Sequence, residues 1–199
     1  MKTGLWESLV DVFIPPRASE RVVRSLNLQI LESLSSEDGL PYHDARVTAL
    51  VWELKYYANR RAAALAGALL SEKLLAAAAE ELGKPLLIPV PMHAARRRER
   101  GHNQTELLCK AALFALRSSQ SEVGPVVEYA PFALKRVLNT KTQQGLPRQV
   151  RLKNVQKCMV AADPKKIEGR ACIVVDDVTT TGATLEEAKR ALRSGGARA

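Results

Sequence analysis

Two adjacent aspartates, Asp176 and Asp177, stand between a short apolar run and a segment rich in threonine and glycine. The run at 172–175 (CIVV) predicts a strand that is buried on both faces of a parallel sheet. Residues 184–194 have the periodicity of an amphipathic helix. The acids and threonines therefore lie on a loop at the carboxyl end of a strand, where ligands bind in open α/β sheets.

The chemistry of this loop is that of a phosphate cradle. Gly182 lets the backbone approach a ligand closely, and amides beside a helix N-terminus can point at an anion. Thr184 and Glu187 have the spacing of a capping box at the start of that helix. The predicted cradle, with its threonine hydroxyls as further donors, comprises Thr179, Thr180, Thr181, Gly182, Ala183 and Thr184.

The two carboxylates need a different partner, because they repel phosphate. They suit the vicinal hydroxyls of a ribose or the water on a magnesium ion, so a ribose 5-phosphate would satisfy both halves of the motif. Two alternatives stay open. One is an ordinary polar turn with Asp177 or Thr184 as a cap, and the other is the strand-end acid pair of a phosphoacceptor receiver domain. Neither explains the hydroxyls and glycine between the acids and the helix.

A second polar group follows another short apolar strand, in residues 88–104 (IPVPMHAARRRERGHNQ). Pro91 stiffens the strand exit. The arginines of 96–100 are expected on a basic loop, where they can bind phosphate bidentately, and the next helix is predicted to begin near Asn103. His102 either packs locally or contacts a ligand, and the sequence does not decide between these.

Residues 134–156 form a third polar segment, which two predicted strands flank. Long loops inside compact domains are often lids, and the Lys and Arg side chains of this one could close over an anionic ligand. A basic surface hairpin is the alternative. The lid side chains expected to act on the ligand are Arg136, Lys141, Gln144, Arg148 and Arg151.

The charge of the chain points to an anionic partner. Thirty Lys and Arg residues against 21 Asp and Glu give a net charge of +9. The excess gathers at 96–100 and at 135–157, which favours a polyphosphate or a nucleic acid as partner; a solvated basic surface is the alternative. Neither segment contains an aromatic residue, so any nucleic acid is expected to bind through its phosphates with little base stacking.

Composition suits one α/β domain with a small accessory segment. The chain has 199 residues and 46% hydrophobic content, and no apolar run is expected to reach the roughly 20 residues of a membrane span. The cysteines, in apolar contexts, indicate buried free thiols in a reducing cytoplasm. Predicted helices cover 5–13, 18–34, 43–57, 60–82 and 103–117, and predicted strands cover 86–90, 126–129, 133–137 and 155–161. Their alternation predicts a parallel sheet.

The stretch VVDDVTTTGATL closely resembles the phosphoribosyl pyrophosphate (PRPP) signature of type I phosphoribosyltransferases. The resemblance implies an α/β fold with a parallel sheet flanked by helices, and binding of PRPP together with Mg²⁺. Asp176 and Asp177 would be the catalytic pair that holds the ribose, and 179–184 would wrap the 5-phosphate. The implied pyrophosphate loop consists of Pro91, Met92, His93, Ala94 and Ala95.

The segments RERGHNQ and LKYYANRR resemble the ComF family more specifically. That family is associated with DNA uptake during natural transformation, which makes single-stranded DNA a second expected partner. The resemblance covers the predicted domain at 43–199 and not the helical segment at 1–42. ComF proteins commonly carry a four-cysteine zinc finger, whereas 14–42 contain no cysteine, so no zinc is expected there. Family members usually continue into one more strand beyond the position of Ala199.

Two functions remain open from the sequence. The first is a phosphoribosyltransferase with a nitrogen acceptor, and the second is a PRPP sensor or scaffold that acts with DNA. Purine-salvage relatives carry an Asp near the base, where this chain has Thr180, so the acceptor is not identified. The oligomeric state is also open, with a dimer among the possibilities.

Overall fold

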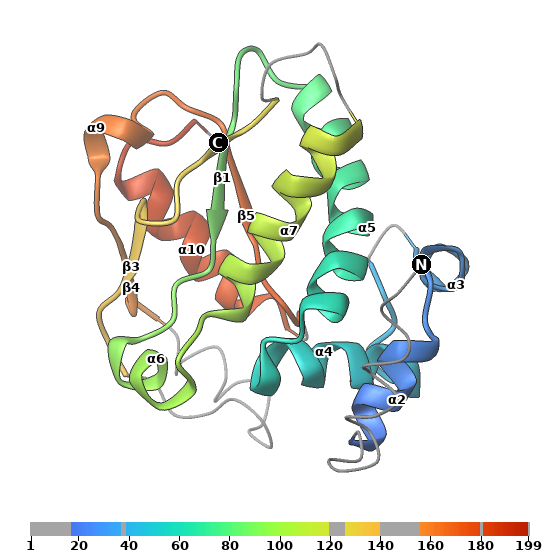
Figure 1. The fold of residues 1–199 in the computed structure, drawn as a ribbon. Coiled ribbons are helices and arrows are strands. Elements are labelled where there is room, and N and C mark those ends of the chain that lie inside the picture. Colours follow the sequence, from blue (N-terminus) through green and yellow to red (C-terminus); the bar gives the residue numbers. More distant parts are fainter. Residues whose placement is uncertain (1–16, 37–38, 120–125, 140–155, 180, 199) are drawn as a thin grey trace.

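The computed structural model describes residues 17–36, 39–119, 126–139, 156–179 and 181–198 (Figure 1). A parallel three-stranded sheet has β1 (Leu86–Pro89) at its centre, between β2 (Glu128–Tyr129) and β5 (Cys172–Val175). The predicted parallel sheet is confirmed, and β1 is buried at all its positions, as expected of a strand that is covered on both faces.

Helices cover the two faces of this sheet. The hydrophobic side chains of β1 alternate between them, because successive residues of a strand point to opposite sides. Leu86 and Ile88 pack with α10 (Ala183–Ser194), whereas Leu87 packs with α5 (Arg60–Ala79) and α7 (Gln104–Ser119). In Figure 1 α5 and α7 run side by side on one face of the sheet, and α10 lies on the other face.

Helix α5 crosses α7 at Gly67. A Cβ atom at this position would lie 2.5 Å from the Cβ of Ala111 and 2.8 Å from the backbone nitrogen of Ala112. Glycine is therefore required by close helix packing, and its low helix propensity is tolerated there. The sequence-based expectation of no long apolar run needs correction, because an 18-residue window of α5 has a mean hydropathy of 1.5, enough for a membrane span by length and composition. Core helices of soluble proteins can meet the same criteria.

The predicted single helix over 18–34 is wrong. The chain forms α2 (Ala18–Ser25) and α3 (Leu28–Leu34), with extended backbone between them. Asn27 causes the restart, because its side chain accepts a 2.9 Å hydrogen bond from the Ile30 backbone nitrogen as an N-cap. Helix α2 packs on α4 (Ala45–Tyr57) and α5, and α3 packs on α5. The predicted helix at 5–13 lies outside the described residues.

The two strands around the third polar segment are confirmed in place but do not join the parallel sheet. β3 (Leu134–Arg136) and β4 (Met159–Ala161) pair antiparallel as a separate sheet. Helix α10 holds this sheet through the buried Glu187, whose carboxylate accepts a 3.1 Å hydrogen bond from the Met159 backbone nitrogen. A short helix, α9 (Pro164–Ile167), follows β4.

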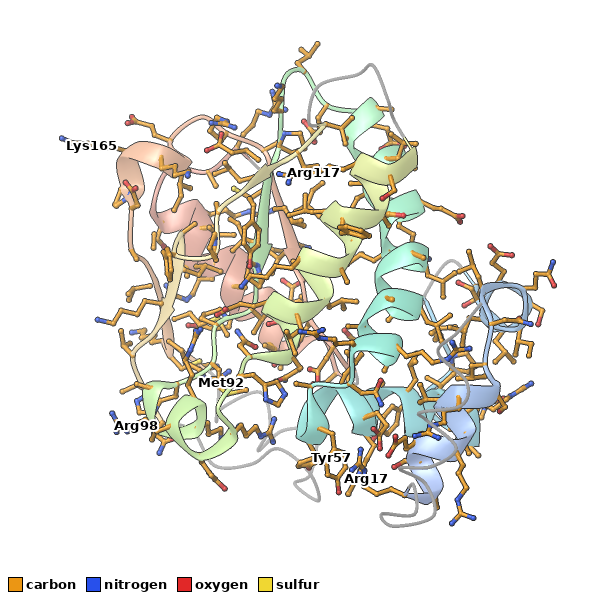
Figure 2. All side chains as sticks on the ribbon, viewed as in Figure 1. Arg17, Tyr57, Met92, Arg98, Arg117 and Lys165 are labelled. Carbon is orange, nitrogen blue, oxygen red and sulfur yellow. The ribbon has the colours of Figure 1, made fainter. Side chains whose placement is uncertain are left out.

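A buried carboxylate attaches α2 to α4. The Glu53 side chain has 0% exposure and accepts hydrogen bonds from Arg17 at 3.0 and 3.2 Å, Ser19 at 2.7 Å and Asn59 at 2.9 Å. Burial alone would raise the pKa of Glu53, but these three donors lower it below its ordinary value. Arg17 also stacks over the Tyr57 ring at 3.7 Å from its centroid (Figure 2).

We therefore predict that Glu53→Ala lowers the free energy of unfolding by about 3 kcal/mol, because it removes the acceptor that Arg17 and Asn59 share. Urea denaturation measures the change. The matched control is Glu72→Ala on the exposed face of α5, which should change stability by less than about 0.5 kcal/mol. Similar effects of both substitutions would show that the Glu53 network contributes little.

Candidate ligand-binding site

The two predicted ligand loops meet at one edge of the sheet. β1 and β5 are adjacent and parallel, with Pro89 opposite Val175. The Val90 backbone nitrogen continues the ladder with a 2.9 Å bond to the Val175 carbonyl. Pro91 leaves one strand and Asp176 leaves the other, so the predicted pyrophosphate loop and the acid pair start side by side.

A hydrogen bond joins the two residues of the acid pair. The Asp177 backbone nitrogen donates to the Asp176 carboxylate at 2.9 Å. Burial, followed by the charge of Asp177, raises the pKa of Asp176 to about 8, and the positive charge of Arg136 only partly opposes this. Two adjacent carboxylates resist full ionisation in such a place. Burial beside Asp177 thus favours the protonated form of Asp176 in the free protein.

The threonine loop lines a small pocket beside Asp176. Its other lining residues are Val178, Thr179, Thr181, Gly182, Ala183, Thr184 and Leu185. The Ala183 backbone nitrogen donates to the Thr181 hydroxyl at 3.4 Å, at the N-terminus of α10. Thr180 lies outside the described residues. Amides at the start of a 12-residue helix and adjacent hydroxyls make a site for an anion.

The predicted capping box is wrong. Gly182 is the N-cap of α10, in a left-handed conformation with φ of 72°, and a Cβ there would meet nothing within 4 Å. Backbone conformation, rather than crowding, thus calls for glycine. Glu187 does not turn back to the helix start, because its carboxylate binds Met159 and Arg190. The Glu187 side chain, which the local pattern assigned to a cap, is therefore engaged in these contacts instead.

The predicted pyrophosphate loop is shorter than expected. Its last two residues begin a helix, α6 (Ala94–Arg100), which His93 caps by accepting a 3.3 Å bond from the Ala95 nitrogen. The arginines expected on a loop are therefore helical, because Ala, Arg and Glu are strong helix formers. Gly101, with φ of 76°, ends the helix. Figure 2 shows Met92 of the loop and Arg98 of α6 in the same part of the molecule.

Positive charges gather next to this loop. Burial, followed by the charges of Arg136 and Arg100, lowers the pKa of Arg96. Arg136 lies on β3 and acts on Asp176 as well, so the structure brings a predicted lid residue to the acid pair. The other predicted lid residues, Lys141, Gln144, Arg148 and Arg151, lie outside the described residues. Like charges held together in this way favour the binding of an anion.

The start of α7 reaches the acid pair through a residue that sequence reasoning missed. The side chains of Asn103 and Thr105 donate to the Val90 carbonyl at 3.2 and 2.8 Å. Between them, Gln104 donates from its amide nitrogen to the Asp177 carboxylate at 3.2 Å. The available signal was a run of three polar residues at the start of an otherwise apolar helix.

His102 packs locally. Its ring nitrogens lie 3.0 Å from the Arg100 carbonyl and 2.9 Å from the Leu54 carbonyl, which joins the end of α6 to α4. Of the two alternatives for this residue, the structure supports the local one. The contact also places the end of α6 beside the exposed face of α4.

That face of α4 carries aromatic side chains. Trp52 and Tyr56 are 44% and 41% exposed, with ring centroids 4.5 Å apart, and the Arg100 guanidinium lies 5.2 Å from the Tyr56 centroid. We call these three residues the aromatic–arginine surface. The basic segments themselves contain no aromatic residue, but the fold brings Arg100 next to aromatic side chains that are distant in sequence.

The cysteines contribute no evident chemistry to the site. Cys109 and Cys158 are buried, Cys172 is partly buried, and all three are free thiols. Burial raises the pKa of each thiol, which makes them poor nucleophiles. In the part of the chain that the structure describes, no group of three or more His, Cys, Asp or Glu side chains could hold a metal ion.

Comparison with known proteins identifies the family. Residues 58–199 match the phosphoribosyl transferase domain. A DNA utilization protein, YhgH of Salmonella typhi, is 33% identical over 154 residues, which are 76% of this chain and 63% of the relative. Competence protein F of Haemophilus influenzae is 34% identical over 108 residues, 54% of this chain and 43% of that protein.

A third relative is competence protein ComFC of Bacillus subtilis, 30% identical over 107 residues, 54% of this chain and 38% of that protein. The chain thus spans less than two thirds of the length of these relatives, and no solved structure matches it. The domain match covers most of the chain and includes both ligand loops. The chain belongs to the phosphoribosyltransferase family and is a ComF-type, phosphoribosyltransferase-like member of it.

Proposed function

We propose that this protein binds PRPP with its magnesium ion at the sheet edge and transfers phosphoribose to a nitrogen acceptor. The observation that carries the proposal is the placement of three complementary groups around one site. These are the acid pair after β5, the threonine loop at the start of α10, and the arginines Arg96 and Arg136. The acids accept hydrogen bonds from the ribose hydroxyls, the threonine loop donates hydrogen bonds to the 5-phosphate, and the arginines supply positive charge for the pyrophosphate.

Each part of the ligand has a counterpart in the site. The amides and hydroxyls of 181–184 bind the 5-phosphate at the helix N-terminus. Asp176 and Asp177 accept hydrogen bonds from the ribose hydroxyls or from water on the magnesium ion that accompanies the substrate. The loop at 91–93, with Arg96 and Arg136, binds the pyrophosphate.

The same placement supports catalysis. The bond from C1 of the ribose to pyrophosphate breaks, the sugar develops positive charge, and a nitrogen nucleophile forms the new bond at C1. The carboxylates of Asp176 and Asp177 stabilise the cationic sugar, while Arg96 and Arg136 stabilise the departing pyrophosphate. The arginine charges are already in place before the reaction, and the positive charge that develops on the sugar favours the ionised form of Asp176.

A second candidate function, binding of single-stranded DNA, is favoured by the aromatic–arginine surface. Exposed rings stack on bases of any sequence, and nearby arginines bind the backbone phosphates. The names of the relatives, a DNA utilization protein and competence proteins, agree with this role. A protein with this function could use PRPP as a signal rather than as a substrate.

The first prediction of this proposal concerns PRPP. PRPP with Mg²⁺ should raise the melting temperature by mass action. The double variant Asp176→Asn with Asp177→Asn should lose most of this rise, whereas Glu72→Gln on distant α5 should keep it. Pyrophosphate release with a panel of nitrogen bases then separates an enzyme from a sensor. Equal PRPP affinity of the double variant and the wild type would rule out this site.

The second prediction concerns pH. Folding raises the pKa of Asp176 from 3.8 to about 8, so protonation favours the folded state. This contribution is fully present below pH 4 and is lost as the pH rises through 8. Asp176→Asn stays neutral at every pH, and should therefore melt at least about 4 °C above the wild type at pH 8 but not near pH 4. Parallel pH profiles of the two proteins would contradict the pKa shift.

The third prediction concerns DNA. A fluorescent oligo-dT should bind at low salt, and Trp52→Ala with Tyr56→Ala should weaken binding by about 1–3 kcal/mol per stacked base without changing the salt dependence. Arg100→Ala should instead reduce the slope of log K against log salt by about 0.7. Phe114→Ala, which removes an exposed ring on α7, is the control. Anisotropy titrations that show no low-salt binding would eliminate this function.

A further inference from the structure

Gln104 has a buried acceptor that nothing in the described part of the protein satisfies. The residue is 9% exposed. Its amide nitrogen donates to Asp177, but its Oε1 atom is buried with no hydrogen-bond partner. An acceptor that is removed from water without a donor costs stability, so such groups are rare and need an explanation.

The orientation of this amide is fixed. Exchanging its oxygen and nitrogen would place Oε1 against the carboxylate oxygen of Asp177, two acceptors with no proton between them. The backbone on both sides is fixed too, because Asn103 and Thr105 each bind the Val90 carbonyl. Gln104 therefore stays beside the acid pair with its oxygen unpaired.

We propose that Gln104 is a ligand-binding residue whose Oε1 accepts a hydrogen bond from an O–H donor held beside Asp177. Both a ribose hydroxyl and a magnesium-bound water are donors of this kind, and both also suit the carboxylate. The inference rests on the proposed PRPP site and adds to it a neutral acceptor from α7. The amide nitrogen positions Asp177, and the amide oxygen contacts the ligand.

The test compares Gln104→Met with the wild type and with Gln29→Met, an exposed control on α3. Isothermal titration measures the affinities for PRPP with Mg²⁺, for ribose 5-phosphate with EDTA, and for inorganic phosphate alone. We expect Gln104→Met to lose about tenfold in affinity for a sugar ligand, or about 1.4 kcal/mol, and to keep its affinity for phosphate. A purely structural role would weaken phosphate binding as well.

Comparing the two sugar ligands shows whether the donor is a ribose hydroxyl or a magnesium-bound water. A loss for ribose 5-phosphate in EDTA assigns the donor to the sugar, and a loss for PRPP with Mg²⁺ alone assigns it to a metal-bound water; both support the proposal. Unchanged affinities, or an equal loss for phosphate, overturn it. In that case the dependence of PRPP binding on Asp176 still tests the proposed function separately, and a wild type that fails to bind PRPP overturns both. Gln104→Leu repeats the test should methionine perturb the fold.

Discussion

The pairing of β1 with β5 is the constraint on which the site depends. Parallel strands end at the same edge, and the register that sets Pro89 opposite Val175 places both following loops at one level. The Val90 backbone binds β5 through its nitrogen and the start of α7 through its carbonyl. A slip by one residue would turn the buried side chains of β1 to the opposite faces. The acid pair, the pyrophosphate loop and Gln104 would then no longer meet.

The site combines groups that oppose one another in the free protein. Burial and the adjacent carboxylate raise the pKa of Asp176, and two other arginines help lower the pKa of Arg96. Gln104 adds a buried oxygen without a donor. Each of these lowers stability, and each would be relieved by a ligand with hydroxyls and phosphates. Conflicts of this kind are expected where a fold gives up stability for binding.

Local patterns predicted the parts of the structure that local forces decide. The run CIVV, the acids after it and the helix from 184 onward follow one another in sequence, so strand, loop and helix were predicted together. The predictions of a capping box with Glu187 and of a single helix over 18–34 were wrong, and the pairing of β3 with β4 in a separate sheet was not predicted. In each case a contact or cap outside the pattern decided the outcome. Two further residues could not be predicted from local patterns. The close packing of Gly67 depends on α7, and the contact of Gln104 depends on Asp177, and both partners are distant in sequence.

Helix α6 connects the two proposed functions. Arg96 and Arg100 lie one turn apart on it, where side chains are neighbours; the first lies near Arg136, and the second contacts Tyr56. Arg100 acts electrostatically on Arg96, so a pyrophosphate group at Arg96 and a DNA backbone at Arg100 would bring two anions into the range over which charges interact at physiological salt, where the Debye length is about 8 Å. Their repulsion would be only partly screened. By linkage, each ligand would weaken the other to the same extent, and this coupling needs no movement of the fold.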